Sequence, residues 1–204
     1  MDFRNNYIKI LVIGPSFKFH DSVSVKIVEL CAKLPGAKYH HAVSLPIFAT
    51  LQRNINSEEV KYMICDLGVA HYQTFPSVNA ILYCINGTDL NDIDEFYVHD
   101  RGKDNTTGFD EKLDDLKNSI LYIVDQRSKY TSDDPNMVGK NLDIAILFYN
   151  DAESNKLKLD SLLNSLNSTL NLDIATYFVS ELEKFDSLVD NYLIRVTKSV
   201  LNLE

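Results

Sequence analysis

YIKILVIG, at residues 7–14, is an apolar run that ends at a glycine, and it sets the expected fold. A parallel strand that is buried on both faces has this composition. The next segment places apolar residues at helical spacing, at Val23, Ile27, Leu30, Cys31 and Leu34. Pro35 and Gly36 then provide a helix stop. The chain therefore begins with a buried strand followed by a helix.

The same alternation continues along the chain. Further strands are expected at Val60–Cys65, Val78–Ile85, Leu142–Tyr149 and Leu172–Val179, with one short strand near Thr50–Ile55. Helices are expected after Phe109, over Leu159–Leu170 and over Leu182–Val200. Apolar strands that alternate with helices indicate an α/β fold, a three-layer, mostly parallel sheet with helices on both faces. We expect a single domain over residues 1–204, with an acidic insertion at 86–108.

Composition narrows the classes of function. The 204 residues include only seven glycines, or 3.4%, against an average of about 7%. Loops that wrap phosphate groups need glycine, so the chain has few residues suited to them. The net charge of −9 argues against direct binding of nucleic acid, which draws on excess positive charge. Hydrophobic residues at 45% exclude a largely disordered chain.

Cysteine usage and targeting signals favour a cytoplasmic or nuclear protein. Cys31, Cys65 and Cys84 lie in apolar runs without CxxC spacing, so we expect reduced core residues. No apolar run reaches the roughly 20 residues of a membrane span. The N-terminus lacks the apolar core of a signal peptide, and Asp2 excludes myristoylation. We therefore expect neither membrane insertion nor a lipid anchor.

Candidate binding residues follow the expected strands. In an open α/β sheet, ligands bind at the carboxyl ends of the strands. The first strand is followed by GPSFKFHD at residues 14–21, the third by DLGV at 66–69, and the fifth by NDAE at 150–153. These three segments would meet at one edge of the sheet.

The stretch CDLG…FPSVNAILYCINGTDL, at Cys65–Leu90, resembles Ras-like small GTPases, most closely their Arf and Sar branch. The order of elements is similar over most of the chain outside the 86–108 insertion. The resemblance implies a P-loop NTPase fold of the small-GTPase type. It also implies where a guanine nucleotide and its magnesium ion would bind, with Gly14, Asp66, Gly68 and Asn150 at matching positions.

The phosphate loop of this family, GxxxxGK[ST], is degenerate in this chain. Gly14 matches the first glycine, but the second glycine is Phe19, the lysine is His20 and the Ser/Thr is Asp21. A bulky ring replaces the glycine whose backbone approaches phosphate. A carboxylate stands where the phosphate charge would lie, which is repulsive without a metal ion. The lysine that stabilises charge in phosphoryl transfer is missing.

The other two motifs of the family are also incomplete. DxGG reads DLGV, so Asp66 and Gly68 match while Val69 replaces the second glycine. NKxD reads NDAE, in which Asn150 matches, Asp151 reverses the lysine's charge and Glu153 is one methylene too long. We therefore expect no catalytic residue, no bound cofactor and no metal. The alternative is a chain that still binds GTP or GDP with magnesium weakly.

Each polar candidate also has a structural interpretation. Asp66 at a strand end is expected to cap a turn rather than bind magnesium. Asp21, next to His20, is expected to be the N-cap of the first helix rather than half of a catalytic pair. His40 and His41 are adjacent, so on a strand they point to opposite faces and cannot share a metal ion.

Two functional hypotheses result, beside a third, an unrelated α/β enzyme with a site at the same strand ends, for which the sequence offers no nucleophile–base pair. The first is a pseudo-GTPase that acts as a scaffold or adaptor subunit in a stoichiometric protein complex, such as an inner-kinetochore or vesicle-trafficking assembly. The chain is loosely similar to centromere protein M, through Ser44-Leu45-Pro46, and to Rab-like adaptor regulators. The second is a divergent small GTPase that regulates membrane traffic. The expected interaction residues, which would fill the vacated pocket or face a partner, are Phe17, Phe19, Tyr72 and Phe75.

Overall fold

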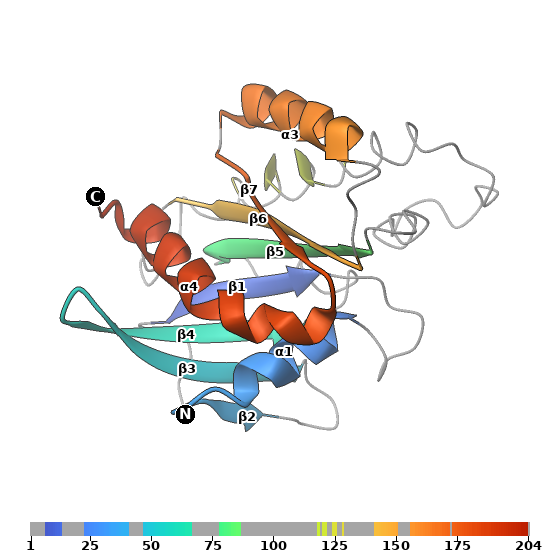
Figure 1. Ribbon diagram of the computed structural model, residues 1–204. Helices are drawn as coiled ribbons and strands as arrows, with labels where there is room; N and C mark the ends of the chain where they lie inside the picture. Colours follow the sequence, from blue (N-terminus) through green and yellow to red (C-terminus); the bar gives the residue numbers. More distant parts are fainter. Residues whose placement is uncertain are drawn as a thin grey trace.

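The computed structural model describes residues 7–13, 23–40, 47–66, 78–86, 141–150, 156–171 and 173–203, with single helical residues between 118 and 128 (Figure 1). Within these ranges, seven strands form one sheet in the order β2-β3-β4-β1-β5-β6-β7. The strands are β1 Ile8–Ile13, β2 Lys38–His40, β3 Ile47–Ile55, β4 Glu58–Asp66, β5 Ala80–Asn86, β6 Asp143–Tyr149 and β7 Ala175–Val179.

The sheet is mixed but mostly parallel. β4, β1, β5, β6 and β7 are parallel to one another, whereas β3 pairs antiparallel with both β2 and β4. Every residue of β1 and of β6 is buried. Their largely apolar sequences arise because both faces of these strands are covered. The predicted α/β class with a mostly parallel sheet is confirmed.

The β2-β3-β4 end of the sheet is larger than the sequence analysis expected. The single short strand predicted at Thr50–Ile55 is part of the nine-residue strand β3, and β2 adds a further antiparallel strand outside it. β3 and β4 form a hairpin through Asn56 and Ser57, whose φ angles are 51° and 69°. Two positive φ angles in a two-residue turn match the twist of the strands that it joins.

Helices α1 (Val23–Ala32) and α4 (Asp186–Leu201) lie side by side on one face of the sheet (Figure 1). They pack on alternate residues of the strands, such as Ile10 of β1 and Ile64 of β4. Tyr62 of β4 is fully buried below α4, with its hydroxyl 2.5 Å from the Thr197 hydroxyl. The Thr197 hydroxyl in turn donates to the carbonyl of Leu193.

The other face of the sheet is also buried. Its side chains include Ile81, Ile146 and Phe148, and Phe148 stacks on Phe178 of β7 with 5.3 Å between ring centroids. Leu163 of α3 (Lys156–Leu170) and Ile120 are buried outside the α1–α4 core. Both faces of the central strands are therefore covered, as a three-layer arrangement requires.

The C-terminal segment departs slightly from the expected single helix. A short 3-10 helix, η4 (Leu182–Phe185), precedes α4. The predicted apolar stripe is confirmed, because Val189, Tyr192, Leu193, Val196 and Val200 are buried. No helix in the described ranges is both long and apolar enough to cross a membrane.

Candidate functional site

The topology defines one candidate edge, at the carboxyl ends of the parallel strands. β1 lies between β4 and β5, so the chain first adds strands on one side of β1 and later on the other side. The strand order therefore reverses next to β1, and ligands of open α/β sheets bind at the carboxyl ends around such a switch point. β1 ends at Ile13, directly before Gly14, with which the degenerate phosphate-loop motif begins in the sequence.

Asp66 is the last residue of β4 and lies opposite Val12 of β1. It is half-buried at the candidate edge, as expected. Burial raises the pKa of the Cys65 and Cys84 thiols, with Lys9 opposing the rise at Cys65, and the charge of Asp66 adds to the rise at both. Asp66 thus places a carboxylate at this edge, next to the end of β1.

Asn150 follows β6 at the same edge and is exposed. Its φ angle is 59°, in the left-handed region that asparagine tolerates better than most residues. Three interstrand steps separate β4 from β6. At about 4.8 Å per step, the two strands lie about 14 Å apart. Asp66 and Asn150 therefore share an edge without forming one compact cluster.

Several predicted residues lie outside the described residues. They are Gly14, Phe17, Phe19, Gly68, Tyr72 and Phe75, together with His20, Asp21, Asp151, Glu153 and the insertion beyond Asn86. Their roles in a vacated pocket or an interface stay predictions.

The cysteines are confirmed as core residues. All three are buried and free. Burial raises the pKa of Cys31 to about 12, with Arg53 opposing the shift, and raises the pKa values of Cys65 and Cys84 still further. A thiol reacts as its thiolate, so these side chains are poor nucleophiles at neutral pH.

His40 has a structural environment rather than a metal-binding one. Its Nε2 lies 3.0 Å from the Thr50 hydroxyl, and its ring stacks on Phe48 with 4.6 Å between centroids. His41 lies outside the described residues. Among the residues that the structure does describe, no group of three or more His, Cys, Asp and Glu side chains could hold a metal ion.

An ionic cluster around the buried Asp143 lies at the opposite end of the strands, and sequence reasoning missed it. Asp143, the first residue of β6, is 3% exposed, and its carboxylate lies 3.4 Å from Nε of Arg195 in α4. Arg195 also donates to the carboxylate of Asp173, 3.2 Å away. Burial raises the pKa of Asp143, while Arg195 and a hydrogen bond from Ser199 oppose the rise. An aspartate inside the apolar run LDIAILFY was the available sequence signal.

Neither models of known protein families nor curated protein sequences include a match to this chain.

Proposed function

We propose that this chain is a pseudo-GTPase, a protein with a small-GTPase-like fold that lacks nucleotide chemistry and serves as a scaffold or adaptor subunit of a protein complex. One observation carries the proposal. The sheet has a switch point at the end of β1, where an α/β protein binds its ligand, yet the sequence that follows has no phosphate-binding glycine–lysine pair.

The residue types at that point oppose a nucleotide. Phosphoryl transfer relies on positioning and on charge stabilisation by a lysine and magnesium. His20 replaces the lysine, and Asp21 adds negative charge where phosphate oxygens would lie. Asp66 at the end of β4 adds a second carboxylate to the same edge. Without bound magnesium, these charges repel a triphosphate.

Residual guanine-nucleotide binding is the alternative, and the placement of Asp66 and Asn150 favours it. Both residues match the family's motifs, and both lie at the candidate edge. In this alternative, Asp66 would bind magnesium and Asn150 would contact the base. The chain would then be a divergent GTPase whose partners depend on the nucleotide state.

Dependence of the complex on nucleotide separates the two functions. The native protein is purified with its partners, in one arm with GTP and magnesium and in the other with EDTA and no nucleotide. An adaptor retains the same partners at the same stoichiometry in both arms. Partners that require GTP and magnesium would contradict the proposal.

A substitution at Phe19 tests the same proposal in a second way. We expect the Phe19→Asp variant to weaken the complex or lower the stability of the fold, because an aromatic ring at the vacated site is expected to be buried there. Ile194→Asp is the matched control, because Ile194 is 38% exposed on α4. If Phe19→Asp leaves both the complex and the stability unchanged, the assignment of Phe19 is wrong.

A further inference from the structure

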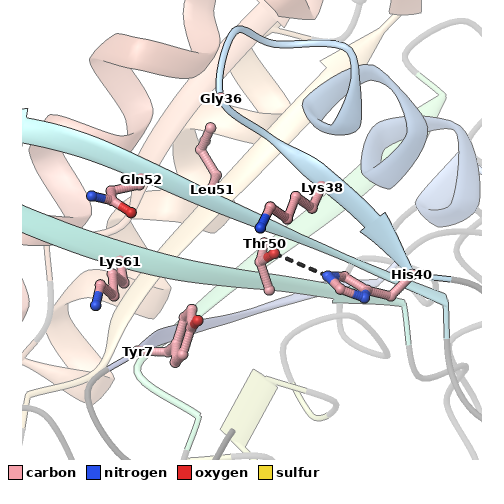
Figure 2. Close-up of a pocket in the computed structure, with 8 residues that line it drawn as sticks. All are labelled: Tyr7, Gly36, Lys38, His40, Thr50, Leu51, Gln52 and Lys61. Carbon is pink, nitrogen blue, oxygen red and sulfur yellow. Dashed lines mark hydrogen bonds between the residues drawn. The ribbon is translucent and has the colours of Figure 1, made fainter. Parts of the chain in front are cut away.

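A small polar pocket lies on the face of the sheet that α1 and α4 do not cover (Figure 2). Its volume is about 90 Å³, and residues of β2, β3 and β4 line it. Strand register brings these residues together: Thr50 pairs with Lys38 on one side, and Gln52 pairs with Lys61 on the other. Side chains at such paired positions project from the same face of a sheet.

The charge in this pocket is positive. Lys38 and Lys61 bring two ammonium groups to it from two different strands. Among the described residues, the carboxylate of Glu59 lies 3.5 Å from the Lys61 ammonium and is half exposed. Positive charge gathered on one face of a chain with a net charge of −9 favours an anionic ligand there.

Hydrogen-bonding groups in the pocket are held in place. Thr50 is 9% exposed, and its hydroxyl is bonded to His40, whose ring is fixed by stacking on Phe48. When Nε2 of His40 donates in this bond, the hydrogen of the Thr50 hydroxyl is left to donate to a ligand. Two ammonium groups and a hydroxyl donor are the groups that bind phosphate oxygens.

We propose that this pocket binds a phosphate monoester dianion, as carried by a phosphorylated serine or threonine side chain of a partner protein. The volume suits one phosphate group, since pockets that enclose whole drug-sized molecules measure roughly 300–1,000 Å³. The position suits an extended peptide, because Lys38 and His40 lie on β2, the outermost strand at this end of the described sheet. The site lies on the sheet face rather than at the carboxyl edge, so it goes beyond the proposed function.

Chemical-shift mapping on the ¹⁵N-labelled full chain tests the pocket. The probes are N-acetyl-phosphoserine amide, inorganic phosphate, unphosphorylated N-acetyl-serine amide, and sodium chloride at matched ionic strength. We expect saturable shifts at Lys38, Thr50 and Lys61 with the phosphoserine probe, and none with the serine probe or with chloride. Saturation by inorganic phosphate alone would overturn the assignment of a monoester ligand.

Three variants identify the groups that bind. Lys38→Gln/Lys61→Gln is expected to weaken binding of the phosphoserine probe at least tenfold. Glu59→Gln is expected to strengthen it severalfold, because a competing carboxylate is removed. Lys26→Gln, at an exposed position of α1, is the matched control and should leave the affinity unchanged.

The same variants show which results would contradict the proposal. Thermal melting of each variant checks that it is folded, and Lys38→Gln alone replaces the double variant if that one is unstable. Equal weakening by Lys26→Gln, or no weakening by the pocket variants, would mean that an adventitious ion only is bound, and would overturn the proposal.

Discussion

Asp143 places a carboxylate inside the core, where Arg195, at 3.4 Å, is its cationic neighbour among the described residues. Removing one partner of a buried pair leaves the other charge uncompensated, which costs more than replacing both. We expect Arg195→Met to lower the free energy of unfolding by about 3 kcal/mol. Asp143→Asn should cost less, because Arg195 is partly exposed and keeps its contact with Asp173.

A double-mutant cycle in urea measures this coupling. Asp143→Asn added to Arg195→Met should restore at least about 1 kcal/mol, because it removes the uncompensated charge. If the two substitutions are simply additive, the ion pair does not stabilise this junction of β6 and α4.

The same carboxyl group predicts a pH dependence. Burial raises the pKa of Asp143 above its ordinary 3.8, so the folded chain holds this proton at a pH where the unfolded chain has released it. The stabilising contribution is present below the unfolded pKa and is lost as the pH rises through the folded pKa. Stability measured between about pH 4 and pH 6 should therefore fall more in the wild type than in Asp143→Asn. Parallel curves would show that Asp143 does not titrate in this way.

The cysteine thiols give a direct test of core burial. We expect iodoacetamide at neutral pH to leave Cys31, Cys65 and Cys84 unmodified in the folded protein, because burial raises all three pKa values. In urea, mass spectrometry should detect three modifications. Fast labelling of any of the three without denaturant would contradict their placement in the core.

At the scale of elements, two features hold α4 against the sheet. One is its apolar stripe, and the other is the pair of hydrogen bonds that links Tyr62, Thr197 and Leu193. Leu193 is fully buried against the sheet, whereas its neighbour Ile194 is 38% exposed. We expect Leu193→Ala to lower the free energy of unfolding by about 2–5 kcal/mol. Ile194→Ala removes the same kind of carbon from a solvated position and should cost less than about 1 kcal/mol. Equal costs in urea unfolding would contradict the orientation of α4.

Sequence patterns located the elements whose burial is uniform or periodic. The apolar runs of β1 and β6 and the stripe of α4 were predicted because both faces, or one whole helical face, are covered. β2 was not predicted, because KYH is three residues long and mostly exposed, so it leaves no periodic signal. The first three residues of β3, Ile47–Ala49, were missed because they follow β2 in a segment without a regular pattern.

The candidate sites also differ in whether the sequence could predict them. Asp66 and Asn150 were placed at one sheet edge because they follow strands, and strand ends can be read along the chain. The pocket near Lys38 and Lys61 could not be predicted from the sequence, because it depends on the register between β2, β3 and β4. The partner of Asp143 was hidden for a related reason: Arg195 is 52 positions away in the sequence, and only tertiary packing brings the two together.

At the scale of the whole molecule, the fold and the sequence give different indications of function. The strand order reverses at β1, the kind of position at which open α/β sheets bind ligands. By the resemblance to small GTPases, the positions that would bind phosphate hold a ring, an imidazole and a carboxylate, at Phe19, His20 and Asp21. The proposed function rests on this difference.

Thermal unfolding of the purified chain with GTP, GDP or neither, each with and without magnesium, tests this most directly. We predict that the melting temperature is the same in all conditions, because no state binds the nucleotide. A ligand present at 100 times its dissociation constant would instead add about 2.7 kcal/mol to the stability of the folded state. A reproducible rise in melting temperature with a guanine nucleotide, and not with ATP, would contradict the pseudo-GTPase.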